Sequence, residues 1–221
     1  MTQEREVAQG SAAAQPDTGV GSWLARLRRR LRQDEARRDA VHDLYLALVA
    51  QARQPALYTD LGVPDSRDGR LELVYLHAIL VMRRLRTEGR PGQELAQDLF
   101  DLLFRDVDRH LREWGVGDLS VGKHVKKLAQ SFYGRAAALD GPLTEADRSG
   151  IAAILERNVF GELAEAPATA AAALADYLLA QERQLATQRG DELLAGKPRF
   201  AAVAAEPDPA ACFVDRAGAR A

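Results

Sequence analysis

The segment from Gly117 to Lys123, GDLSVGK, has the residue types and spacing that begin a phosphate-binding loop. In such a loop the backbone amides surround the phosphates, the lysine reaches them, and a following Ser or Thr holds magnesium. Here the residue after the lysine is His124, and the preceding Arg112-Glu113-Trp114 continues a helix instead of a buried strand. Because a phosphate-binding loop requires the order strand, loop, helix, the sequence argues against nucleotide binding at this segment.

The sequence gives little support for a catalytic metal site or for a catalytic nucleophile. The pair His42-Asp43 is typical of metal-dependent phosphohydrolases, but such sites need further His and Asp ligands that converge on the metal. The other histidines do not stand at ligand spacing: His77, His110 and His124. The single cysteine, Cys212, has no adjacent histidine to activate it. We therefore predict a non-enzyme with no catalytic, cofactor-binding or metal-binding residues.

Alternating charges occupy the middle of the chain. The acidic residues are Asp101, Asp106, Asp108, Glu113 and Asp118, and the interleaved arginines are Arg105, Arg109 and Arg112. Residues three and four apart share one face of a helix, so this pattern predicts surface ion pairs. An alternative is a lipid or isoprenoid enzyme that holds a divalent metal through Asp106 and Asp108.

A basic amphipathic segment lies near the N-terminus. Trp23, Leu24, Leu27 and Leu31 recur at helical spacing after Ser22, a good N-cap residue. Arginines surround this apolar stripe, and the predicted membrane arm comprises Trp23, Arg26, Arg28, Arg29 and Arg30. Such a helix can lie on an anionic membrane surface. The alternative is a first helix that packs on the core and turns its arginines to solvent.

The rest of the chain predicts an all-α protein. Apolar residues recur at helical spacing over 39–53, 70–87, 92–114, 120–139, 144–155 and 168–188, with Gly and Pro between the segments. No segment alternates apolar and polar residues over a stretch long enough to predict a strand. We expect a single irregular bundle of about six or seven helices over 22–197, with a disordered arm at 1–21 and a flexible tail at 198–221.

Composition narrows the function classes further. The net charge of −2 argues against a strongly basic nucleic-acid binder. The longest apolar run, Leu71 to Met82, is shorter than the roughly 20 residues that span a bilayer. One alternative remains, because Gly115 to Arg135 has the outline of a helix-turn-helix whose lysines would reach phosphates.

Three segments resemble one family in particular. They are LYLALVAQARQPALY from Leu44, VPDSRDGRLELVYLH from Val63, and LFDLLFRDVDRHLREWGVGDLSVGKHVKKLAQSFYGR from Leu99. These long and specific motifs closely resemble the ubiquinol–cytochrome c chaperone family. The resemblance covers about residues 44–140.

The resemblance implies a helical assembly factor without enzymatic activity. Such proteins bind newly made cytochrome b, or a related membrane-protein client, during assembly of the respiratory cytochrome bc complex. They work with a small partner protein at the ribosome exit, and the resemblance implies no cofactor and no specific nucleic acid. An Ala- and Arg-rich composition without an acid-poor transit peptide indicates a bacterial member. We expect it in the bacterial cytoplasm, peripheral at the inner membrane.

A client with apolar helices needs a helical groove to cover it. We predict that the helices over 92–114 and 120–139 form this groove. The expected apolar contacts are Phe104, Leu111, Trp114, Val116, Phe132 and Tyr133, about half of which should serve the core instead. Lys123, Lys127 and Arg135 form an expected basic face toward lipid head groups, a ribosome or an acidic partner.

The remaining motif residues have expected structural roles. Pro64 and Gly69 belong to two turns before the helix at Arg70, which Asp65 and Asp68 are expected to cap while Arg70 ties the loop down. Asp118 is expected to cap the helix near Ser120. Gly115, Gly117 and Gly122 suggest positive φ or close backbone approach.

Overall fold

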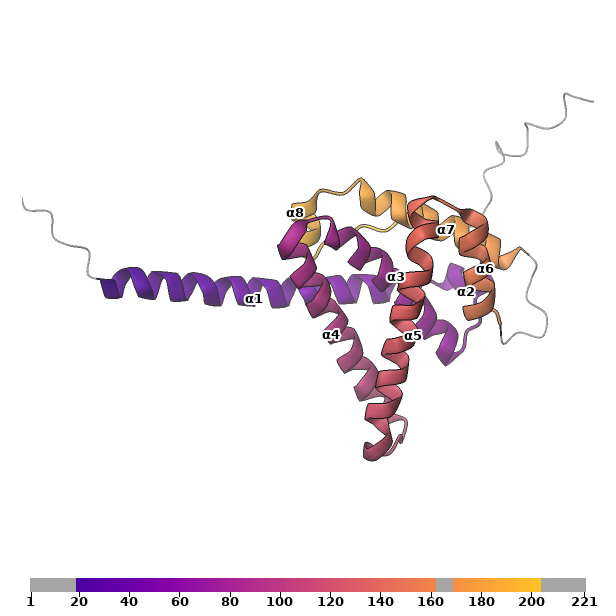
Figure 1. The fold of residues 1–221 in the computed structure, drawn as a ribbon, viewed down its shortest axis with the longest axis horizontal. Helices are drawn as coiled ribbons and strands as arrows, with labels where there is room; N and C mark the ends of the chain where they lie inside the picture. Colours follow the sequence, from indigo (N-terminus) through magenta and orange to yellow (C-terminus); the bar gives the residue numbers. More distant parts are fainter. Residues whose placement is uncertain (1–18, 162–168, 204–221) are drawn as a thin grey trace, which may run out of the picture. The chain divides into compact units, whose positions relative to one another are not determined.

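A computed structural model describes residues 19–161 and 169–203, and within them the protein is all helical (Figure 1). This confirms the predicted fold class. The described residues form eight helices, because two short helices, α2 and α8, join those that the sequence indicates. The helices are α1 (Gly19–Ala52), α2 (Pro55–Thr59), α3 (Arg67–Arg86), α4 (Gly89–Glu113), α5 (Asp118–Thr144), α6 (Arg148–Asn158), α7 (Ala170–Ala186) and α8 (Gly190–Leu194).

Helix α1 is continuous where the sequence suggests two helices. The chain divides into two compact units, 1–36 and 37–221. The first unit contributes the helical backbone from Gly19; the predicted membrane-arm side chains, from Trp23 to Arg30, lie outside the described side chains. In the second unit, Leu44 and Leu48 of α1 are fully buried, and Arg37 forms an ion pair with Glu94 of α4 at 2.8 Å.

Helix α3 lies at the centre of the second unit. Its residues Leu73 to Met82, apart from Val74, are buried, as expected for a helix that is apolar on nearly every side. Tyr75 packs edge-on against Phe132 of α5, with ring centroids 5.2 Å apart, and contacts Phe104 of α4 at 6.0 Å. These aromatic contacts fix α3, α4 and α5 against one another.

The turn before α3 differs from the prediction in one detail. Ser66, and not Asp65 or Asp68, caps the helix by accepting a hydrogen bond from the Gly69 amide at 3.1 Å. Asp65 instead accepts from Arg70 at 2.6 Å, so Arg70 ties the loop down as predicted. Gly69 is required because a Cβ there would lie 2.1 Å from the carbonyl oxygen of Pro64.

Helices α4 and α5 form a hairpin that narrows to a turn (Figure 1). Gly115 has a φ of +81° in this turn, which confirms the need for glycine. Gly117 and Gly122 show neither positive φ nor a crowded Cβ position, so that prediction is wrong for both. Asp118 makes no cap hydrogen bond; its carboxylate pairs with Arg112 at 2.5 Å, because α5 begins at Asp118 itself.

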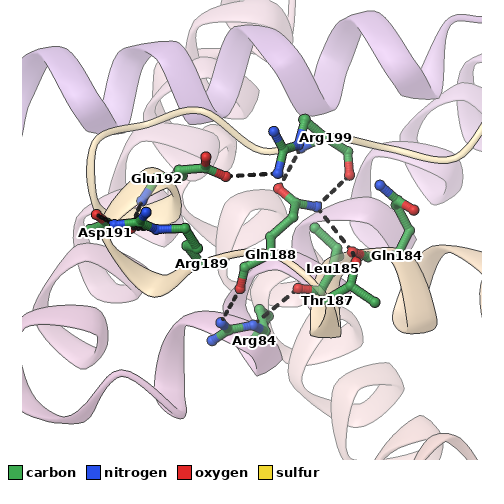
Figure 2. A network of polar contacts seen from close by, with 9 residues as sticks. All are labelled: Arg84, Gln184, Leu185, Thr187, Gln188, Arg189, Asp191, Glu192 and Arg199. Carbon is green, nitrogen blue, oxygen red and sulfur yellow. Dashed lines mark hydrogen bonds and ion pairs between the residues drawn. The ribbon is translucent and has the colours of Figure 1, made fainter.

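The segment 198–203 runs along α7, although the sequence assigns it to the tail. The side-chain amide of Gln188, in the loop after α7, forms two hydrogen bonds with the backbone of Arg199 (Figure 2). Its nitrogen donates to the Arg199 carbonyl, and its oxygen accepts from the Arg199 N–H at 2.8 Å. Gln181 does the same with Ala201, at 2.8 Å in both directions. Two buried glutamines therefore hold this strap, residues 199–203, through its backbone. The tail from 204 onward lies outside the described residues.

Candidate interaction surface

The predicted groove between α4 and α5 is closed by the core. Three of the six expected apolar contacts, Phe104, Leu111 and Phe132, are buried. These three therefore belong to the core, in line with the expectation that about half of the six would serve it. Amphipathic helices in a hairpin bury their apolar faces against each other before any partner arrives.

Two of the expected contacts are exposed. Trp114 is 52% exposed and Tyr133 is 50% exposed, while Val116 is partly buried against the core. In the described part of the chain, Leu46 is the remaining large apolar side chain with comparable exposure. The two exposed aromatic side chains lie at separate places on the hairpin, Trp114 at the turn and Tyr133 on the surface of α5.

A cleft of about 370 Å³ lies beside Tyr133, between α3 and α5. Its apolar walls include Ile79 and Met82 of α3 and Phe132 of α5. Phe100 of α4 supports the Tyr133 ring at a centroid distance of 5.0 Å. A second hollow of about 660 Å³ shares lining residues with the first and extends to α7. We call the two hollows together the α3 trough.

The charged end of the α3 trough contains arginines that the sequence analysis missed. Arg83 reaches Asp140 of α5, and its Nε lies 3.5 Å from a carboxylate oxygen of Glu182 on α7. Within the described residues, neither this Nε nor the second Glu182 oxygen has a hydrogen-bond partner, although both atoms are buried. Arg86, at the trough surface, forms no ion pair within the described residues. The sequence feature that could have indicated these arginines is the pair Arg83-Arg84, which follows the apolar run of this helix.

Arg135 does not belong to a basic face. Its guanidinium forms an ion pair with Glu72 of α3, with side chains only 10% and 13% exposed, and also donates to Asn158 at 3.1 Å. Burial raises the pKa of the Glu72 carboxyl, although Arg135 opposes the effect. This pair links α3, α5 and the end of α6, so the predicted partner contact at Arg135 is replaced by a structural role.

The predicted lysines do face solvent. Lys123 and Lys127, together with Lys126, are exposed and form no ion pair within the described residues. The acidic residues nearby pair with arginines instead, as predicted: Asp106 with Arg109, and Asp108 with Arg112 at 2.7 Å.

Comparison with known proteins now gives the family. The profile of the family described as ubiquinol-cytochrome C chaperone matches residues 59–200, more than half of the chain. The chain belongs to this family. A crystal structure of the Cbp3 homolog from Brucella abortus is 37% identical and superposes with a TM-score of 0.73, covering 80% of this chain and 97% of that one.

Vertebrate relatives of this chaperone family member are more distant. The ubiquinol-cytochrome c reductase complex assembly factor 1 of Mus musculus and that of Homo sapiens are each 24% identical over 151 residues. The match covers 68% of this chain, which spans about half the length of both relatives. The Xenopus laevis protein of similar name is 22% identical, with 74% of its length matched. None of these relatives is named as a nucleic-acid-binding protein.

The family match extends beyond the residues that carried the resemblance. It begins at Thr59, after the first residues of the expected family-like core of 44–140, continues past residue 140 through α6, α7 and α8, and ends at Phe200 in the strap. The α3 trough, Tyr133 and the hairpin turn all lie within the match, whereas the basic N-terminal segment precedes it.

The family is named for a chaperone and not for a reaction. Among the described residues, no group of three or more His, Cys, Asp or Glu side chains is placed to hold a metal ion. His77 is fully buried, with Nδ1 donating to the Leu73 carbonyl at 2.7 Å and Nε2 accepting from the Tyr177 hydroxyl at 2.7 Å. Burial lowers the pKa of His77 to about 4. Over the described ranges, no helix has both the length and the apolar character needed to cross a membrane.

Proposed function

We propose that this protein is an assembly factor of the respiratory cytochrome bc complex and binds cytochrome b before it enters the complex. The family match over residues 59–200 carries the proposal. The 37% identity to the Cbp3 homolog over most of both chains supports it, as do the names of the vertebrate relatives.

The α3 trough is the surface that we assign to the client. A membrane-protein segment exposes apolar helix surface in water, and a helical groove with apolar walls covers such a surface. Tyr133 is the exposed apolar side chain of the trough and lies beside the buried Ile79 and Met82. Arg86, which forms no ion pair within the described residues, provides a cation for a client carboxylate. This assignment retains Tyr133 from the predicted α4–α5 groove and moves the client surface to the side of α5 that faces α3, because Phe104, Leu111 and Phe132 serve the core.

Location and further partners follow from the same function. We place the protein in the bacterial cytoplasm, peripheral at the inner membrane, where a client would emerge. A small partner protein or a ribosome is a further partner in this proposal. The basic segment from Trp23 to Arg30 would help the protein reach the membrane. Deleting residues 1–33 should then lower the membrane-bound fraction while leaving the helical content of residues 37–203 intact.

Cross-linking in cells that lack the native gene tests the client. Cells carrying the wild-type protein should yield cytochrome b as a cross-linked product and assemble the cytochrome bc complex, measured by native gel and by the haem b absorbance of membranes. Tyr133→Ala should reduce both. Leu46→Ala is the matched control, since Leu46 is similarly exposed but lies on α1, outside the α3 trough.

Two results would contradict the proposal in different ways. Normal assembly of the complex in cells without the protein would remove the assembly function. Normal assembly with Tyr133→Ala, and impaired assembly with Leu46→Ala, would retain the function and move the client surface away from the α3 trough.

A further inference from the structure

We propose that the tip of the α4–α5 hairpin binds the anionic head groups of a lipid bilayer. The tip comprises Trp114, Val116, Lys123, Lys126 and Lys127. This inference deepens the membrane association proposed above, because it names a lipid-binding surface separate from the N-terminal segment. Its test uses vesicles and no client, so it can fail while the assembly function stands.

The distribution of lysine carries the inference. The chain has 30 Lys and Arg residues, of which only four are lysines, and three of these four are Lys123, Lys126 and Lys127. Arginine, with its planar fork, suits ion pairs of fixed geometry. Lysine is a compact, mobile charge that suits diffuse attraction to a charged surface. Nearly all basic positions of the chain are arginine, and three of its four lysines lie together near the start of α5.

The charge of these lysines is not neutralised by their neighbours. All three are exposed on the first three turns of α5, and none forms an ion pair within the described residues. The carboxylates of the same region contact arginines: Asp118 pairs with Arg112 at 2.5 Å, and Glu113 lies 3.9 Å from Arg109. The free charge of the tip is therefore positive.

Trp114 adds the apolar part of the surface. It follows the last residue of α4, before Gly115, and half of its side chain is exposed. The guanidinium of Arg67 lies 4.9 Å from the centre of the indole ring, so a cation already covers one side of the ring. Tryptophan is enriched at the interface between membrane and water, where its indole enters the head-group layer. Basic surfaces that also carry tryptophan bind anionic lipids.

A membrane explains this tip better than a nucleic acid does. Base recognition relies mainly on Arg, Asn and Gln, and the arginines of the tip are engaged by carboxylates. A bilayer needs only a small basic patch with an amphipathic ring, because the lipid head groups rearrange to meet it.

The fluorescence of Trp114 tests the proposal directly. The chain has two tryptophans, so Trp23→Phe leaves Trp114 as the single reporter in the full chain. Vesicles of phosphatidylcholine with phosphatidylglycerol should shift its emission to shorter wavelength and protect it from iodide, and added salt should reverse the effect. Vesicles of phosphatidylcholine alone should leave the emission unchanged. The variant Trp114→Phe reports in the same way on Trp23 alone.

Lysine variants give the second measurement. Lys126→Gln should weaken vesicle binding about fivefold, and the triple change of Lys123, Lys126 and Lys127 to Gln on the order of a hundredfold. Lys197→Gln is the matched control, because Lys197 is exposed and lies outside the tip. Three outcomes overturn the proposal: unchanged Trp114 emission while the protein sediments with vesicles, equal effects of Lys126→Gln and Lys197→Gln, or preferential binding of RNA by the tip at equal salt.

Discussion

Replacing Gln181 by Met should release the strap from α7. The Gln181 side chain is fully buried, and its amide both donates to the Ala201 carbonyl and accepts from the Ala201 N–H, each at 2.8 Å. Methionine is similar to glutamine in length and flexibility, so it leaves no large cavity. It has no amide group, however, and cannot form the two hydrogen bonds. The substitution therefore isolates the hydrogen bonds from the packing.

The expected loss is about 1–3 kcal/mol in the free energy of unfolding. Each hydrogen bond contributes about 0.5–1.5 kcal/mol net, and two are removed. The upper end is limited because Ala201 is only partly buried, and its carbonyl keeps a bond from Gln51 at 3.2 Å. A loss of about 2 kcal/mol corresponds to a fall of about 4–8 °C in Tm for a chain of this size.

Urea unfolding of two variants in two backgrounds tests this reasoning. Gln184→Met is the matched control, because Gln184 lies on the same helix and its side chain forms no hydrogen bond within the described residues. In a chain that lacks residues 199–221, Gln181→Met should cost nothing or stabilise, since the glutamine has no strap to bond. An equal loss in both backgrounds would refute the view that Gln181 acts through the strap.

Three further perturbations have defined outcomes. Burial lowers the pKa of His77 to about 4, below the unfolded value of about 6.5, so wild-type stability should fall by up to about 3 kcal/mol as pH falls from 6.5 toward 4. His77→Gln should remove this dependence in urea titrations at several pH values. Arg135→Met should cost about 3–5 kcal/mol by leaving the buried Glu72 carboxylate unpaired, and adding Glu72→Leu should restore most of it; no recovery in calorimetry would contradict the pairing. Gly115→Ala should cost about 1–2 kcal/mol because its φ is +81°, whereas Gly117→Ala, at −60°, should be nearly neutral by thermal unfolding.

Much of the fold follows from helical periodicity. The stripe from Leu95 to Leu111 predicts the buried face of α4, and the apolar run of α3 predicts its central place. The single helix α1 was missed because the stretch between Leu31 and Val41 has no apolar stripe. That stretch contains no Gly or Pro and consists largely of helix-forming residues, so the backbone continues without a break.

Features that depend on distant neighbours could not be predicted. The strap is held because Gln181 and Gln188 meet backbone groups up to 20 residues away, and a glutamine in a helix pattern carries no sign of such a partner. The exposure of the candidate surface residues could not be predicted for the same reason. Periodicity shows which residues share a face, but it does not show that Tyr75 already covers the face of Phe104 and Phe132. Trp114 was predicted only as one of six apolar contacts, and its exposure follows from its place at a turn, beyond the apolar stripe of α4.

Helix α7 joins the strap to the proposed client surface. Gln181 faces the strap, while its neighbour Glu182 faces the α3 trough and lies near Arg83. The next arginine of α3, Arg84, donates to the carbonyls of Leu185 at 3.1 Å and Gln188 at 2.8 Å (Figure 2), where a cation also meets the negative end of the helix dipole. Two consecutive arginines thus anchor α3 to α7 by different contacts, one through a side chain and one through the backbone. Because the strap holds the opposite side of α7, the position of Glu182, and with it the charged end of the trough, depends on residues that the sequence alone would place in a free tail.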